Sequence, residues 1–257
     1  MLFKPASAGK VALLLALFSA LPVFGQSDAE KYYQWTLDEF HRTQVTFQTN
    51  GQIASNCWIF ARACFNLAED ATNSEQRADI AKYGIAACHQ LLARDPNSAA
   101  GHYYLGMDEG EYADAEAPSL TSYRLVHEME NEFLTAAKLD KNMDYGGAAR
   151  CLGLLYRDAP GWPLSLGSRA KAHEWLVRAA VINPGYPENY LNLAEGDLRW
   201  HEGKEAEAAL KKLDAIWPAA QTNLTGVGWI KNWSDWTSQR AAAKALLQKD
   251  FKHVSGP

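Results

Sequence analysis

The sequence predicts an all-α fold in which antiparallel helical hairpins stack side by side. Apolar residues recur at three-and-four spacing through most of the chain, which is the pattern of amphipathic helices. Similar segments return after about 44 residues, half of the 88 that separate Pro96 from Pro184 in two matching helix ends. Alternating apolar and polar runs of strand length are missing. We expect about four hairpins and additional terminal helices.

The first 25 residues have the features of a signal peptide. Two lysines precede an apolar run at residues 11–24, which is too short to span a bilayer, and small residues end it at Gly25. We expect residues 1–25 to be removed and residues 26–257 to form a single helical-repeat domain, periplasmic or secreted. An uncleaved leader that stays in the membrane is the alternative.

Loss of the leader makes the chain more acidic. Two of the 25 basic residues and none of the 30 acidic ones lie in the leader, which leaves a mature net charge of −7. This charge argues against nucleic acid and against a polybasic membrane contact. We expect another exported protein as the partner, and a homo-oligomer is also possible.

The helices are expected in pairs, after an opening helix at residues 28–47. Within the first pair, two apolar stripes comprise Ile53, Cys57, Phe60, Ala61, Cys64 and Ala68, and then Ile80, Gly84, Ala87, Cys88 and Leu91. Ser74 is the expected N-cap of a helix at residues 77–93. The later pairs are predicted at 98–115 and 127–140, 146–156 and 169–184, and 187–203 and 204–218, followed by a capping helix at 233–248. Trp229, Trp233 and Trp236 share one face and should pack this cap onto the last hairpin.

The four cysteines suggest one disulfide. If the first hairpin turns near residues 72–73, Cys57 and Cys88 lie at equal distances from the turn, on facing stripes. Helix axes 8–10 Å apart permit the Cα separation of about 5.5–6 Å that a disulfide prefers. We predict a Cys57–Cys88 disulfide, with two buried free thiols as the alternative. Cys64 and Cys151 are expected to be unpaired.

Local sequence motifs for catalysis, metals or cofactors are missing. The seven histidines include no H-E-x-x-H pair, Ser165 lacks the glycine pattern of a nucleophile elbow, and neither phosphate-binding glycine motif occurs. We therefore expect a protein that is not an enzyme and has no cofactor or metal. A catalytic site assembled from several repeats would leave no such motif.

Four residues are candidates for partner or ligand binding. Trp162 lies between two prolines in "DAPGWPLSLGS", where it could cap the gap between repeats, anchor a partner or form a pocket wall. His102 and Tyr103 occupy a first helix of a pair, the type that lines the concave face of such arrays. Tyr156 is the fourth, and His102 is also interpreted as a buried histidine with satisfied hydrogen bonds. The acidic run that contains Asp108, Glu109, Glu111, Asp114 and Glu116 is interpreted as a solvated face.

Residues 58–195 resemble a known family. The segment "GGAARCLGLLYRDAPGWPLSLGSRAKAHEWLVRAAVINPGYPENYLNLAE", with "ARACFNLAE" and "DPNSAAGHYYLG" before it, is similar to the T-component of TRAP transporters. The resemblance implies a tetratricopeptide-like fold and an accessory role beside the transporter's substrate-binding protein. Members of that family are typically lipoproteins, whereas "LPVFGQ" contains no cysteine, so lipid tethering is not expected here.

Three functions remain as hypotheses. The first is an exported, non-enzymatic repeat protein that binds another protein, as an accessory component of a TRAP-type uptake system. The second is a small-ligand carrier with an aromatic pocket between repeats, formed by residues such as Tyr103, Tyr156 and Trp162. The third is an enzyme with a dispersed site.

Overall fold

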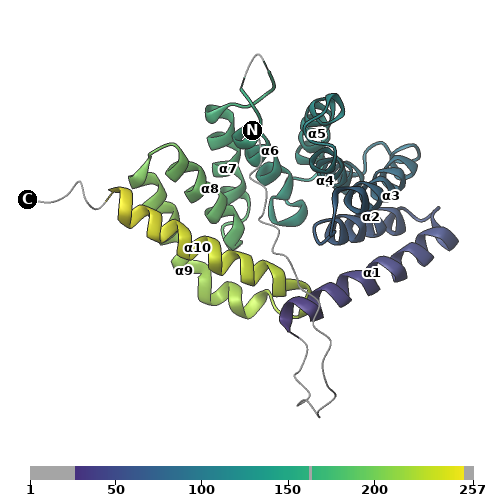
Figure 1. Cartoon of the computed structure of the whole chain (residues 1–257), viewed down its shortest axis with the longest axis horizontal. Coiled ribbons are helices and arrows are strands. Elements are labelled where there is room, and N and C mark those ends of the chain that lie inside the picture. The colour runs from purple at the N-terminus through teal and green to yellow at the C-terminus, as the bar shows by residue number, and fades with distance from the viewer. Residues whose placement is uncertain (1–26, 162–163, 252–257) are drawn as a thin grey trace, which may run out of the picture.

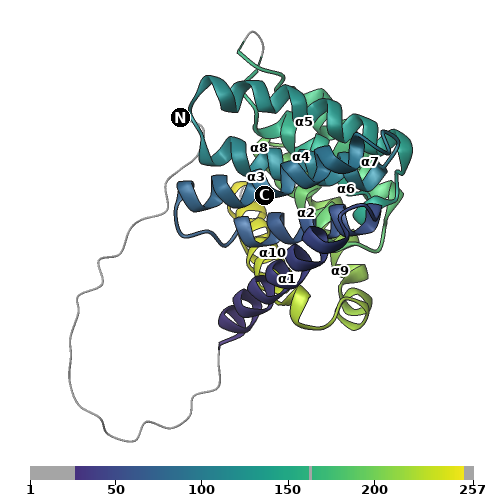
Figure 2. The ribbon, with the colours of Figure 1, turned by 90° about the vertical axis from the view of Figure 1, so that its right-hand side faces the viewer.

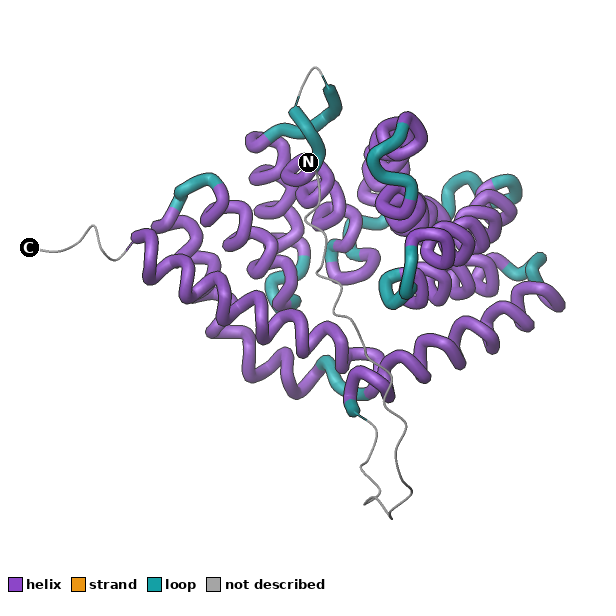
Figure 3. Tube along the Cα trace, viewed as in Figure 1, coloured by secondary structure: helices purple, strands orange, loops and turns teal. Residues whose placement is uncertain are grey.

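A computed structural model describes residues 27–161 and 164–251, and this part of the chain is almost entirely helical (Figures 1 and 3). The predicted all-α fold is confirmed. In chain order the helices are α1 (Asp28–Asn50), α2 (Ala54–Ala68), α3 (Ser74–Leu92), α4 (Ala99–Ala115), α5 (Leu120–Leu139), the 3₁₀ turn η1 (Met143–Tyr145), α6 (Gly147–Asp158), α7 (Arg169–Ile182), α8 (Pro187–Arg199), α9 (Gly203–Asn223), the 3₁₀ turn η2 (Val227–Trp229) and α10 (Ile230–Phe251). None of the described helices is long and apolar enough to cross a membrane. The predicted signal peptide lies outside the described residues.

Side-chain caps mark the starts of several helices. Asn73, Ser98, Ser119 and Ser168 each accept a hydrogen bond from the backbone N–H three residues later. The cap of α3 is therefore Asn73 and not the predicted Ser74. Helix α5 begins seven residues earlier than predicted, because Ser119 forms a capping box with Ser122.

The hairpins α2/α3, α4/α5, α6/α7 and α8/α9 pack in sequence along an arc (Figure 1). Their first helices also contact one another, α2 with α4 and α6 with α8, and so form the inner face of the arc. Glycines allow close packing between helices: a Cβ at Gly106 would lie 2.7 Å from the Phe133 ring, and one at Gly153 would lie 2.6 Å from the Leu176 side chain.

The two terminal helices close this arc. Helix α1 packs on η2 and on α10, although these segments lie about 200 positions apart in the sequence (Figures 1 and 2). The predicted tryptophan face is confirmed here: Trp236 is 2% exposed in the core formed with α8 and α9, and Trp229 and Trp233 pack against it. The inner face of the repeats is thereby enclosed.

The predicted Cys57–Cys88 disulfide is not formed. All four cysteines are free, and Cys57 and Cys88 are both completely buried. The Cys57 thiol lies 3.1 Å from the Gly51 carbonyl oxygen and 3.2 Å from the Arg94 guanidinium, so its direction is set by the α1–α2 connection. Sequence spacing placed the two cysteines on neighbouring helices but gave no information about the direction of the side chain.

Between α6 and α7, residues 159–161 lie close to residues 164–168. The Gly167 N–H donates to the Pro160 carbonyl oxygen (2.8 Å), and a Cβ at Gly167 would overlap the Ala159 carbonyl oxygen, so glycine is required there. Leu164, on this loop, is 74% exposed. Trp162 itself lies outside the described residues.

Candidate functional site

A cavity of about 620 Å³ lies inside the closed arc. Its walls come from α1, η1, η2, α10 and the first helices of the hairpins, and among the described residues none of its lining comes from the second helices. Nine of the lining residues are aromatic: Tyr32, Trp35, Phe65, Tyr103, Tyr104, Tyr145, Tyr186, Trp229 and Trp236. Seven are charged: Arg62, Glu69, Asp144, Arg150, Glu188, Lys231 and Asp235.

Contacts between the two ends of the chain form one wall of the cavity. The Trp35 ring of α1 covers Gly228 so closely that a Cβ there would lie 3.0 Å from it. The Lys231 ammonium of α10 donates to the Asp70 carboxylate (3.0 Å) and lies 3.5 Å from the Glu69 carboxylate. The lysine therefore ties the end of α2 to the start of α10.

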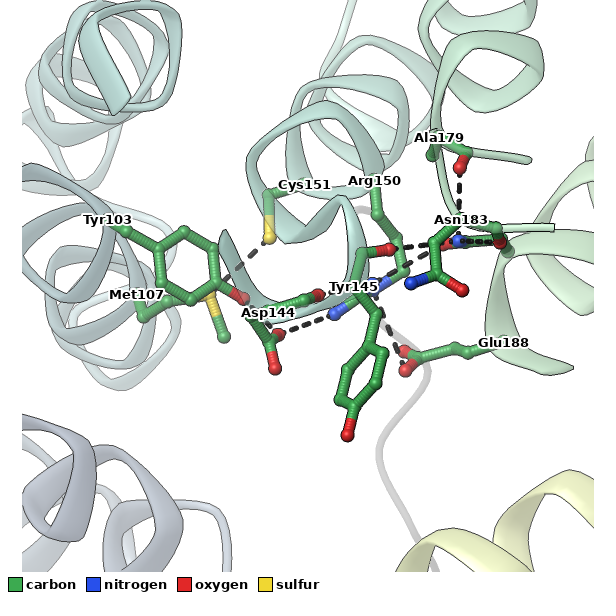
Figure 4. Close-up of polar contacts among 10 residues, drawn as sticks. Tyr103, Met107, Asp144, Tyr145, Arg150, Cys151, Ala179, Asn183 and Glu188 are labelled. Atoms are coloured by element: carbon green, nitrogen blue, oxygen red, sulfur yellow. Dashed lines mark hydrogen bonds and ion pairs between the residues drawn. The ribbon is translucent and has the colours of Figure 1, made fainter. Parts of the chain in front are cut away.

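An unusual turn before α6 forms another part of the wall. Asp144, Tyr145 and Gly146 are consecutive residues with left-handed backbone angles (φ 47°, 57° and 83°). This conformation costs about 1–3 kcal/mol for each non-glycine residue. The Asp144 carboxylate stabilises it by accepting hydrogen bonds from the Tyr103 hydroxyl (2.6 Å) and the Arg150 guanidinium (2.7 Å; Figure 4).

Arg150 is the centre of this polar group. Its side chain is only 6% exposed and lies between Asp144 and Glu188, the latter at 3.5 Å. Burial lowers the pKa of Arg150, but the two carboxylates outweigh that effect and hold it above its usual range. The Asn189 side chain accepts a hydrogen bond from Arg150 and donates one to the Tyr145 carbonyl oxygen (3.0 Å). It therefore helps to hold the same turn.

The strained turn places an aromatic ring in the cavity. Tyr145 is 37% exposed and stacks on Tyr186, with ring centroids 4.6 Å apart and planes within 4° of parallel. Trp229 meets both rings edge-on, at 6.0 and 6.3 Å. In Figure 4 the Tyr145 ring and the Glu188 carboxylate project toward the same open space. Aromatic faces and hydrogen-bonding groups are thus side by side.

The pKa of Glu69 depends on the other charged groups around the cavity. Enclosure raises the pKa of Glu69 above its usual value, Asp70 and Glu188 raise it further, and Lys231 opposes these effects. Arg62, on α2, makes no ion pair with any described carboxylate. Five of the other charged residues of the wall form two ion-paired groups, Arg150 with Asp144 and Glu188, and Lys231 with Glu69. Asp235 makes no ion pair with a described residue but helps to raise the pKa of Lys231.

The predicted site residues are not all in one place. Tyr103 lines the cavity and is 1% exposed. His102 faces α5, where its two ring nitrogens lie 2.5 Å from Glu132 and 2.9 Å from the Pro96 carbonyl oxygen, as expected of a histidine with satisfied hydrogen bonds. Tyr156 is buried and donates to Glu130 of α5, away from the cavity.

The interpretation of the acidic run as a solvated face is wrong for its first residues. Asp108 is 0% exposed and Glu109 is 5% exposed, and neither Asp108 oxygen has a hydrogen-bond partner among the described residues. Asp108 lies four residues after Tyr104 and three after Leu105, both buried, so it continues the apolar stripe of α4. Glu111 and Asp114 pair with Arg77, and Glu116 is exposed.

The array of helical hairpins has a tetratricopeptide (TPR)-like fold. A thermophilic TPR protein of Thermus thermophilus superposes on this chain with a TM-score of 0.59 and 17% sequence identity, over 85% of this chain and 100% of the other. At this identity the likeness shows the fold. The chain matches no protein-family model and is significantly similar to no curated protein sequence. The described residues hold no cluster of side chains suited to a metal ion.

Proposed function

We propose that this protein is a non-enzymatic binding protein of the TPR type that holds a small ligand in its central cavity. The closure of the arc by α1 and α10 carries the proposal, because it converts an open concave face into a partly enclosed cavity. The volume of about 620 Å³ falls within the range of about 300–1,000 Å³ typical of ligand pockets. Aromatic walls with a few fixed polar groups are the usual composition of such sites.

The backbone strain at residues 144–146 supports this function. Left-handed non-glycine residues are retained where the surroundings hold them, and they concentrate at binding and active sites. Here the turn, held by Arg150 and Tyr103, leaves the Tyr145 ring accessible inside the cavity. The polar groups of the turn bond mainly to neighbouring side chains. The position of the Tyr145 ring is therefore fixed before a ligand binds.

Native mass spectrometry of the protein purified from its own compartment tests the proposal. We expect a mass increment of a few hundred daltons that disappears on denaturation and is lost in Trp229→Ala. Tyr123→Ala, which removes an exposed aromatic ring outside the cavity, is the matched control and should retain it. The proposal fails if the wild type carries nothing and a broad panel of small molecules changes neither its tryptophan fluorescence nor its melting temperature.

A groove on the outer surface favours a second function, docking of a protein partner. The groove, about 160 Å³, lies between the α4–α5 turn and the end of α6, where the Trp162 loop begins. Nearby, Leu120 is 89% exposed, and Leu164 on the Trp162 loop is 74% exposed. The resemblance to TRAP T-components would make the partner an exported solute-binding protein and would place this chain in the periplasm.

Charge substitution tests this second function. Leu120→Glu should abolish complex formation with a co-purifying exported protein, or self-association, when the wild type and variant are compared by sedimentation. Val181→Glu replaces a residue on α7 that is also largely exposed (74%) and is the control. Identical sedimentation of wild type and Leu120→Glu would show that the exposed apolar surface beside the groove does not dock a partner.

A further inference from the structure

We infer that the cavity selects a neutral, polyhydroxylated ligand, a carbohydrate of one or two rings. This inference rests on the proposed function and adds the chemical class of the ligand. It follows from three properties of the cavity wall: its ion pairs form around Arg150 and Lys231, its lining offers side-chain amides beside carboxylates, and accessible aromatic faces lie beside them.

The paired charges argue against an ionic ligand. A ligand anion would have to compete with Asp144 and Glu188 for Arg150, or with Glu69 and Asp70 for Lys231. Breaking a buried pair leaves a charge uncompensated, which costs more than a new surface contact returns. Arg62 is the remaining cation of the lining, but the lining as a whole holds four carboxylates (Glu69, Asp144, Glu188 and Asp235) and three cationic side chains, so its net charge also disfavours a free carboxylate or phosphate.

An organic cation meets a different obstacle. Aromatic rings near carboxylates suggest a cage for an ammonium group. However, the Arg150 guanidinium already lies 4.9 Å from the centroid of the Tyr186 ring, and Lys231 occupies the other carboxylate group. A second cation beside either would be repelled. The position that a cage would offer is filled by the protein's own side chains.

Ligand hydroxyl groups can bond to the carboxylates and N–H donors of the cavity wall. Each hydroxyl both donates and accepts, so it can bond to a carboxylate oxygen and to an amide or guanidinium N–H at once. The cavity offers carboxylates on Glu69 and Glu188, and donors on Arg62, Asn66 and Asn232. The Gln239 side-chain oxygen, also in the lining, is buried and has no partner among the described residues. A polyol can satisfy such a wall without disturbing its ion pairs.

The aromatic rings provide the second part of carbohydrate recognition. The C–H face of a sugar ring carries partial positive charge and packs on the negative face of an aromatic ring. Tyr145 is the accessible ring of the stacked pair, and Trp229 stands at an angle of 68° to it. Glu188 lies next to this corner, because it shares Arg150 with the turn that carries Tyr145. A sugar stacked there would have its hydroxyls within reach of the polar wall.

Calorimetric titration with defined probes tests the inference. Glucose, N-acetylglucosamine, maltose and cellobiose represent neutral carbohydrates, and succinate, choline and glutamate represent an anion, a cation and a zwitterion. We expect binding of at least one carbohydrate and of none of the three ionic probes. Tyr145→Ala should weaken that binding about tenfold, corresponding to about 1.4 kcal/mol, and Tyr123→Ala should leave it unchanged. Because no ionic contact is involved, the affinity should change little with added salt.

The outcomes separate the ligand class from the proposed function. If an ionic probe binds, no carbohydrate does, and Tyr145→Ala abolishes that binding, the cavity is a ligand site and the carbohydrate inference is wrong. If no probe of any class binds and the purified protein carries no ligand, both the inference and the proposed function fail. Circular dichroism and melting temperature of Tyr145→Ala show whether a loss of binding comes from misfolding.

Discussion

Replacing Glu109 by glutamine should make the stability of the protein less dependent on pH. Glu109 is 5% exposed on α4, and one of its carboxylate oxygens is buried without a partner among the described residues. Burial raises the pKa of Glu109 from 4.5 to about 8, the charges of Glu132 and Glu128 on α5 add to the shift, and Arg124 opposes it. The folded protein therefore binds a proton at Glu109 that the unfolded chain releases at a lower pH.

The sign and size of the effect follow from this difference in proton binding. The proton on Glu109 stabilises the folded form in full below about pH 4.5. This stabilisation falls as the pH rises from about 4.5 to about 8 and is lost above that. At about 1.4 kcal/mol per pKa unit, the loss is on the order of 4–5 kcal/mol. For a domain of this size that corresponds to a fall in melting temperature of roughly 10 °C. Glutamine is neutral at every pH and has the same shape. The stability of Glu109→Gln should therefore not show this loss as the pH rises.

Differential scanning fluorimetry between pH 5 and pH 9 measures it. We expect the wild type and Glu109→Gln to melt at similar temperatures at pH 5 and the variant to melt several degrees higher at pH 9. Glu207→Gln, at an exposed position in α9, is the control and should follow the wild type. Parallel curves for the wild type and Glu109→Gln across this range would show that the Glu109 carboxyl is not held neutral, and the reasoning would be refuted.

Three further predictions concern the closure, the packing and the thiols. Lys231→Met should remove about 1–2 kcal/mol of stability and increase hydrogen exchange in α1 but not in α4. Lys231→Arg should preserve the protection of α1 from exchange. Equal exchange in α1 for wild type and Lys231→Met would show that the lysine does not hold the closure. Gly84→Ala should destabilise by about 1–3 kcal/mol because its Cβ would overlap the Asp108 carboxylate, whereas Gly185→Ala meets nothing closer than 3.7 Å; equal melting of the two variants would contradict this. Non-reducing peptide mapping should find four free cysteines, and a reductant should leave the melting temperature unchanged; a cross-linked peptide pair would contradict the structure.

Helices were predictable from the sequence because their determinants are local. The stripe at Ile80, Gly84, Cys88 and Leu91 repeats every three or four residues, and all four positions are buried on α3. The error at Asp108 has a different origin. Composition alone suggested a solvated segment, whereas the phase of the stripe, continued from Tyr104, places this carboxylate in the interior. Periodicity was the better guide than polarity at that position.

The cavity was not predictable in this way because it depends on contacts between distant parts of the chain. Its closure needs Lys231 to meet Asp70, 161 positions away, and no repeat pattern specifies that contact. Tyr103 was recognised because first helices line the inner face of such arrays. Tyr186 lies outside the regular helical stripes, in the connection between α7 and α8, so periodicity gave no indication of its place. The spacing of Trp229 with Trp233 and Trp236 predicted its packing on the last hairpin but not its place in the cavity wall.

The turn at residues 144–146 connects folding and binding most directly. Two glycines follow Tyr145 in the sequence, and Gly146 takes the left-handed conformation that glycine adopts without strain. Asp144 and Tyr145 have no such freedom, so their conformation must be held by the Arg150 and Tyr103 hydrogen bonds. A glycine at either position would fold at lower cost but would lose the carboxylate or the aromatic ring. The strain is therefore best explained by what the turn presents to the cavity, which is why Tyr145 is the residue whose removal should separate stability from ligand binding.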